Sequence, residues 1–295
     1  MSQLLAIGEC MIEFAPAPDG LFSMGYAGDT FNTAWYARRI APPGVDVGYV
    51  TAVGDDSASD AMLAFMESSG VTPHAPRRSD RSVGLYLISL KDGERSFSYW
   101  RNASAARTLA DDLTALPDLK PGDIAYMSGI TLGILPPEGR ARLFSVLAEA
   151  RSGGVRVAFD PNLRPRLWPS NDEMCRVVME GAEVSDIALP SFEDEADHFG
   201  DADLAATADR YTNAGASVVA VKNGPGDMLI REGGADRIVT PDPAPAVVDT
   251  TAAGDSFNAA FFVALMAGKS PAEAAMDGAR LAARVIGARG ALIDL

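Results

Sequence analysis

The chain has 295 residues, of which 47% are hydrophobic and 22% charged, and its formal net charge is −15. These are the proportions of a globular protein with enough chain to bury a core. So acidic a chain is unsuited to binding nucleic acid or an anionic membrane surface, because both are polyanionic, but a few local arginines can still bind a small anionic substrate.

The sequence shows no sign of secretion or membrane insertion. The two cysteines, Cys10 and Cys175, cannot form a disulfide framework. The first residues carry neither a basic segment nor a cleavage site. The longest apolar run, Ala259–Ala267, is far shorter than the roughly 20 residues of a membrane span. We expect a cytoplasmic protein that partners neither nucleic acid nor membrane.

Short apolar runs alternate with helical patterns along most of the chain, with no repeat or linker, so we expect one domain over residues 1–295. The runs are apolar throughout, as in parallel strands covered on both faces, and the alternation indicates an α/β layered sandwich. The expected strands are Leu4–Gly8, Val47–Val53, Asp123–Ser128, Val155–Asp160, Ile187–Leu189 and Val218–Lys222. The expected helices are Thr30–Ile40, Ala58–Ser68, Pro137–Arg151, Asp172–Glu183, Leu204–Ala214, one from about Gly254 and one over Pro271–Ile286.

Two pairs of short strands interrupt this order: Ile12–Phe14 with Phe22–Tyr26, and Val83–Leu90 with Ser96–Trp100. The glycine-containing segment Lys91–Arg95 predicts a hairpin loop in the second pair. Both pairs are rich in aromatic residues. We expect a small sheet, within residues 12–26 and 83–101, that serves as a lid or a dimer interface. A decorated edge of the main sheet is the alternative.

The segment Asp249–Asn258 is the most distinctive. Small residues at Ala252, Ala253 and Gly254 let backbone N–H groups approach a ligand, and the following helix directs its positive end to the same point, which suits phosphate. Asp255 stands where it can accept a proton from an attacking hydroxyl. A simple helix cap is the alternative, but it leaves Asp249 and the small residues unexplained.

Other polar residues stand at helix starts and strand ends. Asp29 and Asn32, after Gly28, are three residues apart, so both can face one polyhydroxylated ligand, although a capped helix start explains them equally well. Basic residues that follow predicted strands, where α/β folds place ligands, are Arg101, Arg164 and Lys222. Arginine suits bidentate binding of carboxylate or phosphate, whereas a lone surface arginine is usually solvated. No P-loop or dinucleotide-binding motif is present: Gly268-Lys269-Ser270 lacks the first glycine of a P-loop and closes a helix.

Together these segments resemble the ribokinase-like (PfkB) carbohydrate kinase family over essentially the whole chain. The N-terminal signature of that family is similar to the segment Ala27-Gly28-Asp29 with Asn32 and Ala34. Its C-terminal signature is similar to the segment Asp249–Asp255. The resemblance implies a three-layer α/β/α sandwich with a small β-sheet lid. Finer features resemble the 2-keto-3-deoxygluconate kinase branch: Gly8–Glu13, Gly84–Tyr86, Tyr99–Asn102, Asn162–Trp168 and the pair Ala252-Ala253.

That resemblance implies ATP-dependent phosphorylation of 2-keto-3-deoxygluconate at its C6 hydroxyl. It implies Asp255 as general base, with the amides of Ala252, Ala253, Gly254 and Asp255 stabilising the phosphoryl group. The implied sugar-binding residues are Gly28, Asp29, Asn32, Tyr86, Tyr99, Arg101 and Arg164. The implied nucleotide-side residues are Asn162, Arg164, Lys222, Gly224, Gly226 and Gly287–Ala291. Because a keto acid carries a carboxylate, we expect Arg101, Arg164 or both to bind it or the incoming phosphate.

The same resemblance implies Mg²⁺ bound with ATP, potassium near Asp249 and Thr251, and a homodimer or higher homo-oligomer formed through the lid. One departure concerns the Asn-x-x-Glu motif of relatives: if Glu195 is its glutamate, as an indirect magnesium organiser, Phe192 occupies the asparagine position. Glu193, Asp194 and Glu195 all supply carboxylates, and the choice among them as magnesium organiser stays open. The alternatives are a family member acting on fructose, 5-dehydro-2-deoxygluconate or ribose, and, from another class, an inactive sugar-binding sensor. The sensor requires loss of the base or the anion hole, and both motifs are present.

Overall fold

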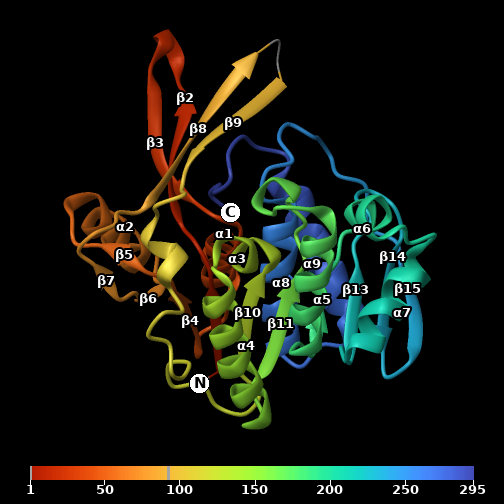
Figure 1. The fold of residues 1–295 in the computed structure, drawn as a ribbon. Coiled ribbons are helices and arrows are strands. Elements are labelled where there is room, and N and C mark those ends of the chain that lie inside the picture. Colours follow the sequence, from red (N-terminus) through yellow and green to blue (C-terminus); the bar gives the residue numbers. More distant parts are fainter. Residues whose placement is uncertain (1, 92–93) are drawn as a thin grey trace.

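A central sheet organises the fold, seen in a computed structural model that describes residues 2–91 and 94–295. Within these residues it has nine strands in the order β15-β14-β13-β12-β11-β10-β1-β4-β6 (Figure 1). The strands from β6 to β13 run parallel, and β14 and β15 are antiparallel. The bounds are β1 Ser2–Ile7, β4 Val45–Val50, β6 Thr72–His74, β10 Ile124–Ser128, β11 Arg156–Asp160, β12 Ile187–Ala188, β13 Val218–Val221, β14 Met228–Glu232 and β15 Ala235–Val239.

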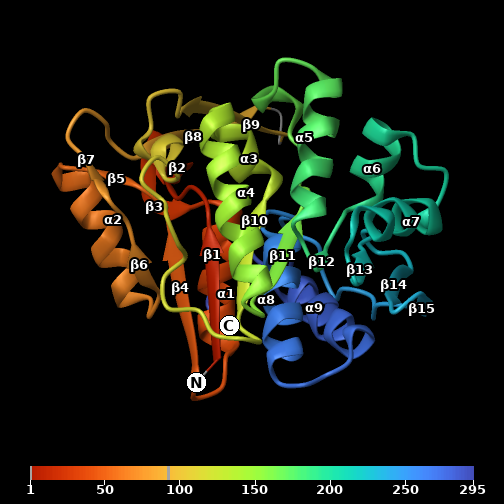
Figure 2. The ribbon, with the colours of Figure 1, turned by 60° about the horizontal axis from the view of Figure 1, so that its bottom comes forward.

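Helices cover both faces of this sheet (Figure 2). One core contains Leu4 and Ala6 of β1 with side chains of α1 Asp29–Ile40, α2 Ser57–Ser68, α8 Ala253–Met266 and α9 Pro271–Val285. The other contains Leu5 and Ile7 with side chains of α3 Gly129–Ile134, α4 Pro137–Ser152, α5 Asn171–Glu183, α6 Phe192–Phe199 and α7 Leu204–Ala214. Successive side chains of β1 thus point to opposite faces of the sheet, and each face is covered by a core. Both faces are buried, which explains why the strand sequences are apolar at every position. The predicted α/β/α sandwich is confirmed.

Some elements differ from the prediction. The expected strand Val47–Val53 is interrupted: β4 ends at Val50, and β5 Val53–Gly54 pairs instead with β7 Arg77–Arg78. The strands β14 and β15 and the helices α3 and α6 were not predicted. In β14 the buried apolar run is limited to Met228–Ile230 and is followed by Arg231 and Glu232, and β15, at the sheet edge, is exposed over most of its length, so neither strand carries the signal of a long buried run. Short 3-10 helices span Pro18–Gly20, Ala105–Thr108 and Pro165–Leu167.

The two predicted strand pairs form one small sheet that projects from the body (Figure 1). Its order is β3-β2-β8-β9, with bounds β2 Met11–Pro16, β3 Phe22–Ala27, β8 Gly84–Lys91 and β9 Glu94–Trp100. A parallel pairing of β2 with β8 joins the hairpins, which we call the lid. The predicted hairpin loop over Lys91–Arg95 contains residues 92 and 93, which lie outside the described residues.

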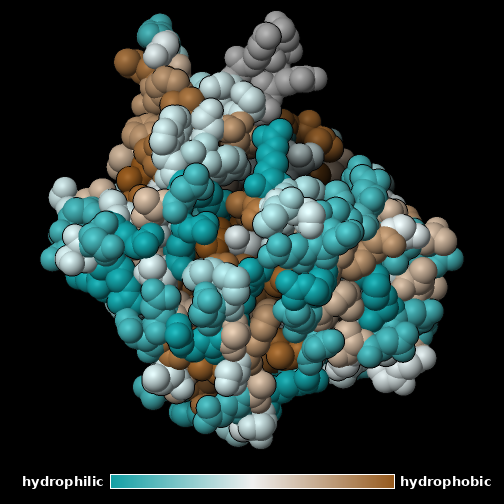
Figure 3. Space-filling model, viewed as in Figure 1, coloured by the Kyte–Doolittle hydropathy of each residue, from teal (hydrophilic) through white to brown (hydrophobic). Residues whose placement is uncertain are grey.

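The lid has two distinct faces, because cross-strand neighbours point to the same side. One face carries the row Glu13, Tyr86 and Tyr99. The opposite face exposes apolar side chains, among them Met24 (57% exposed) and Trp100 (59% exposed). Apolar residues are visible on the lid in Figure 3. In the described part of the chain, no helix is long and apolar enough to cross a membrane.

Candidate active site

The two signature segments meet at the carboxyl edge of the sheet, although they lie at opposite ends of the chain. Asp255 is in the first turn of α8, and its Oδ2 accepts a hydrogen bond from Asn32 Nδ2 of α1 at 2.8 Å. Thr33 Oγ1 donates to the backbone oxygen of Asp255 at 3.1 Å. The contact between α1 and α8 therefore holds the predicted base against the predicted sugar-binding helix.

Tight backbone packing explains a glycine at the start of α1. A Cβ on Gly28 would lie 2.1 Å from the carbonyl oxygen of Glu9, closer than side-chain and backbone atoms can approach. With no side chain at this position, α1 begins directly against the chain that leaves β1. The start of α1, with Asp29 and Asn32, is therefore placed at the end of β1, at the carboxyl edge where α/β folds bind ligands.

Three carboxylates gather here and affect each other's protonation. Burial, followed by the charge of Asp29, raises the pKa of Asp255 to about 7, and Asp160 at the end of β11 adds to the effect. The hydrogen bond from Asn32 and the charge of Lys222 oppose it. Burial also raises the pKa of Asp29, whose Oδ2 accepts a hydrogen bond from Asn162 Nδ2 at 2.8 Å. A carboxyl group that titrates near neutrality is suited to general base catalysis.

Lys222, the residue after β13, places a buried cation beside these acids. Its Nζ lies 2.8 Å from Asp160 Oδ2 and 3.4 Å from Asn258 Oδ1. Asn258 Nδ2 donates to the same Asp160 oxygen at 2.6 Å. A Cβ on Gly254 would lie 3.7 Å from Lys222 Nζ, so the ammonium group stands next to the first turn of α8. Cation and helix N-terminus together favour an anion at this point.

The predicted anion hole lies in the small-residue turn that leads into α8. Ala252 has the left-handed values φ 59° and ψ 17°, which turn the chain into the helix. The N–H of Ala253 donates to the carbonyl oxygen of Thr250 at 3.2 Å, so this amide is engaged within the turn. The Asp249 carboxylate is also structural: it accepts from Thr251 Oγ1 at 2.7 Å and from the amide of Gly290 at 2.8 Å. The turn and the segment Gly287–Ala291 are therefore joined.

The lid brings its predicted residues to the same edge. Tyr86 is buried and donates a hydrogen bond to Glu13, while the Tyr99 ring lies 5.8 Å from the Tyr86 ring. The apolar cluster of Tyr86 and Ile88 includes Ala291 and contacts Ala252. The inner lid face thus packs against both the turn before α8 and the C-terminal segment.

Arg101 and Arg164 occupy different environments. Arg101 directly follows β9, is 8% exposed and forms an ion pair with the buried Glu9. It also lines a pocket of about 650 Å³ formed by residues 79–83 and 99–104. Arg164 is exposed, and its one ion pair in the described residues is a 3.9 Å contact with Asp194.

The structure corrects the assignment of Glu195. Its side chain is fully buried in α6 and bonds to Arg210 Nη2 at 2.8 Å and to the Tyr211 hydroxyl at 3.0 Å. The preceding residue, Asp194, is the one whose pKa responds to Arg164, Asp160 and Lys222, although burial is the main cause of its raised pKa. A helix turns neighbouring side chains by about 100°, so a one-residue error in the motif points to the wrong side.

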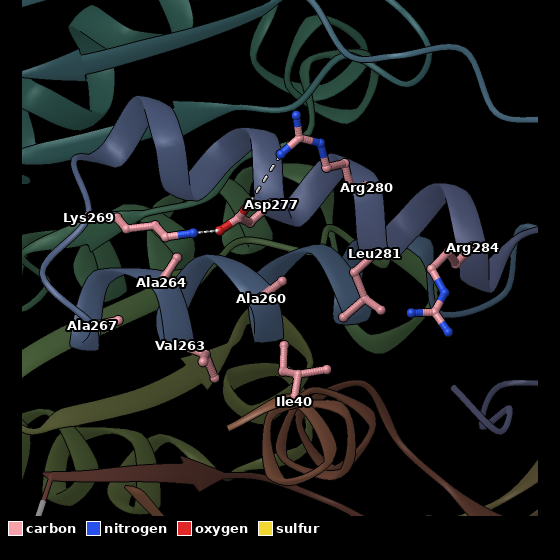
Figure 4. A pocket seen from close by; sticks show the side chains of 10 residues that line it. All are labelled: Ile40, Ala260, Val263, Ala264, Ala267, Lys269, Asp277, Arg280, Leu281 and Arg284. Atoms are coloured by element: carbon pink, nitrogen blue, oxygen red, sulfur yellow. Dashed lines mark hydrogen bonds and ion pairs between the residues drawn. The ribbon is translucent and has the colours of Figure 1, made fainter. Parts of the chain in front are cut away.

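Other predicted nucleotide-side residues lie beyond β13. Gly224, with φ 52°, and Gly226, whose amide donates to the Asn223 oxygen at 2.8 Å, form an exposed turn directly after Lys222. A groove of about 360 Å³ between α8 and α9 is separate from the site, since none of the predicted site residues lines it (Figure 4). Among the described residues, no cluster of three or more acidic, histidine or cysteine side chains is arranged to hold a metal ion.

Sequence reasoning assigned no role to several residues of this region: Glu9, Asp160 and Asn258. Asp160 and Asn258 had a usable signal. Asp160 is the last residue of a predicted strand, and Asn258 stands three residues after Asp255, on the same side of a helix.

The chain is similar over most of its length to several known sugar kinases. The 2-dehydro-3-deoxygluconokinase of Escherichia coli (strain K12) is 40% identical over 303 residues, covering 99% of this chain and 98% of that protein. The enzyme of that name from Haemophilus influenzae is 37% identical over 302 residues, covering 100% and 96%. A fructokinase of Rhizobium leguminosarum bv. trifolii is 29% identical, covering 89% and 79%.

Solved structures agree in fold. Aminoimidazole riboside kinase from Salmonella enterica superposes with a TM-score of 0.85 at 20% identity, covering 98% of this chain and 94% of that one. Fructokinase from Vibrio cholerae O395, in its fructose-, ADP- and calcium-bound form, gives a TM-score of 0.83 at 21% identity, covering 99% and 94%. The model of the pfkB family of carbohydrate kinases matches residues 1–295. The chain therefore belongs to the pfkB family of carbohydrate kinases.

Proposed function

We propose that this protein transfers the γ-phosphoryl group of ATP to the C6 hydroxyl of 2-keto-3-deoxygluconate. The observation that carries the proposal is Asp255, a carboxyl group with a pKa of about 7, at the start of α8 and beside the cation of Lys222. The relatives named 2-dehydro-3-deoxygluconokinase, at 37% to 40% identity, support this choice of substrate.

In the proposed reaction, Gly28, Asp29 and Asn32 bind the sugar so that its C6 hydroxyl meets Asp255. The hydroxyl oxygen forms a bond to the γ-phosphorus as the bond from that phosphorus to the bridging oxygen of ADP breaks. Asp255 takes the hydroxyl proton, and ADP leaves with the electron pair of the broken bond. Asn32 keeps the Asp255 carboxylate in position through its 2.8 Å hydrogen bond.

Negative charge on the transferring group is stabilised by fixed dipoles and cations. The N-terminal turn of α8, including Ala252, Ala253, Gly254 and Asp255, supplies the dipole, and Lys222 supplies a positive charge. Asn162, Gly224, Gly226 and the segment Gly287–Ala291 border the nucleotide. These groups are held by protein contacts before any ligand arrives, as with Lys222 on Asp160 at 2.8 Å.

Mg²⁺, when bound with ATP, neutralises phosphate charge and holds the phosphates in a reactive geometry. The carboxylates of Asp160 and Asp194, both under the influence of Lys222, fit a metal that is held mainly by phosphate oxygens and water. Asp194 replaces Glu195 as the carboxylate that orients the metal's water shell. A monovalent cation such as potassium suits the oxygen-rich turn of Asp249 and Thr251, where hydroxyl, carboxylate and carbonyl oxygens meet.

Two arginines and two tyrosines suit the acid substrate. Arg101 and Arg164 supply donors for its carboxylate, and Tyr86 and Tyr99 contact it from the lid. The exposed apolar face of the lid supports a homodimer or higher homo-oligomer formed through this sheet. The cytoplasm, where ATP is available, is the proposed location.

The experiment is an ADP-release assay with a panel of sugars at fixed Mg·ATP. We expect the highest kcat/KM with 2-keto-3-deoxygluconate. A higher kcat/KM with fructose, ribose or 5-dehydro-2-deoxygluconate would move the protein to another branch of the family. Binding of sugar without any ADP release would instead identify an inactive sensor.

A further inference from the structure

Glu9 has no role in the proposed reaction, yet its carboxylate is enclosed by the parts that form the sugar side of the site. It stands two residues after β1, and its side chain is fully buried. A Cβ on Gly84, at the start of lid strand β8, would lie 3.0 Å from Glu9 Oε1. The Glu9 carbonyl oxygen packs against Gly28, as described above. Glu9 therefore joins β1, the lid and the N-terminus of α1.

The carboxylate is bound by two side chains from the segment that follows the lid. Its Oε2 forms the ion pair with Arg101 Nη2, and Ser104 Oγ donates a hydrogen bond to its Oε1. Burying a carboxylate is unfavourable unless it is paired. The pair also compensates the charge of Arg101, so the site does not hold an isolated buried cation when it is empty.

Arg101 retains a donor that this pairing does not satisfy. Nη2 is engaged by Glu9, but within residues 2–91 and 94–295 Nε is shielded from water and has no hydrogen-bond partner. Buried donors of this kind are uncommon in folded proteins. Nε and one terminal nitrogen of a guanidinium form the fork that binds a carboxylate through two parallel hydrogen bonds. Arg101, which lines a pocket with Tyr99, therefore keeps one donor of that fork, Nε, unpaired while Glu9 holds the other end of the guanidinium.

We propose that Glu9 is a positioning residue that fixes the direction of the Arg101 guanidinium, so that its unpaired Nε donates to the carboxylate of the sugar acid. This inference rests on the proposed function, because it requires an acid substrate. It differs from a purely structural ion pair in one respect. Loss of Glu9 must weaken binding of the acid more than binding of ATP, whatever it does to folding.

The test compares Glu9→Gln with Glu195→Gln, since each removes the charge of a wholly buried glutamate paired with an arginine. Glu195 lies outside the site, so its variant reports the cost of losing such a pair. For Glu9→Gln we expect KM for 2-keto-3-deoxygluconate to rise at least about tenfold, with KM for ATP within about twofold of wild type. Glu9→Asp, which restores the charge, should recover part of the affinity. Glu195→Gln should lower the melting temperature and leave both KM values unchanged.

Ser104→Ala provides a second route if Glu9→Gln does not fold, because it removes one hydrogen bond to Glu9 and keeps the charge. It should raise KM for the acid by a smaller factor of about three. An unchanged KM for the acid in Glu9→Gln, or in Ser104→Ala where that variant must be used, would overturn the positioning role. A wild-type enzyme that prefers a neutral sugar would overturn the proposed function first, and the inference with it.

Discussion

Asn32 donates a hydrogen bond to Asp255 across 223 residues of sequence, at 2.8 Å. The bond joins the N-terminal turn of α1 to that of α8. It stabilises the ionised form of Asp255, whereas burial and the charges of Asp29 and Asp160 stabilise the protonated form. The balance leaves the carboxyl group able to exchange a proton near neutral pH.

The first prediction concerns the base itself. Asp255→Asn keeps the shape of the side chain but cannot accept the proton, so we expect kcat to fall by about 10² to 10⁴. Sugar and nucleotide affinities, measured by calorimetry, should stay close to wild type. A variant that retains wild-type kcat would show that another group accepts the proton.

The second prediction is a pH profile. Asp255 must be ionised to accept a proton, and its pKa is raised to about 7, so kcat/KM should decline as pH falls through that value. Asn32→Ala removes a bond to the ionised form and should move this acidic limb to higher pH. Asp29→Asn removes a neighbouring negative charge and should move it to lower pH. If the acidic limb of the pH profile has the same midpoint in both variants as in the wild type, a group other than Asp255 controls it.

The third prediction concerns Lys222. In Lys222→Met the buried Asp160 loses its ionic partner. Breaking a buried ion pair costs about 3–5 kcal/mol, so we expect the free energy of unfolding to fall by that amount. The same change removes a positive charge from the start of α8, so KM for ATP should rise at least about tenfold. Urea unfolding and steady-state kinetics measure the two effects.

Lys222→Met combined with Asp160→Asn separates these effects. The double variant contains no unpaired buried charge, so it should recover stability while KM for ATP stays high. Recovery of both quantities would show that Lys222 serves only to neutralise Asp160.

The fourth prediction tests the lid as an interface. Sedimentation at micromolar concentration should give at least twice the chain mass of 30.9 kDa. Met24→Asp and Trp100→Asp place charges on the exposed apolar face of the lid and should release monomers. Ile238→Asp, on β15 and 58% exposed, is the matched control and should leave the assembly intact. Wild-type protein that sediments as a monomer would contradict the prediction.

Much of the fold could be predicted from the sequence because its signals are local. The strands of the sheet centre are uniformly apolar, and α1 and α8 each begin in a small-residue turn. The hairpin β14–β15 could not be predicted in this way. In β15 the residues from Ala235 to Ile238 are all exposed, so neither a buried run nor a helical period marks it.

The site was predictable where residues cluster in sequence and not where folding creates the cluster. Asp255 follows its anion-binding turn directly. The pair of Lys222 and Asp160 instead joins residues 62 positions apart in the sequence. It forms because β11 and β13, separated in the sheet by β12 alone, both end at the carboxyl side of the sheet. Glu195 shows the converse. A motif placed it at the site, but the helical phase of α6 points its side chain into the core.

The packing of Tyr86 and Ile88 against Ala252 and Ala291 has a thermodynamic consequence. A single sheet covers the groups that we propose to bind the sugar and also contacts the turn and the tail that we propose to border the nucleotide. We therefore expect a movement of that sheet to change both sets of contacts at once, so that occupation of one half of the site alters the affinity of the other. Linkage then requires that ATP change the affinity for the sugar by the same factor as the sugar changes the affinity for ATP.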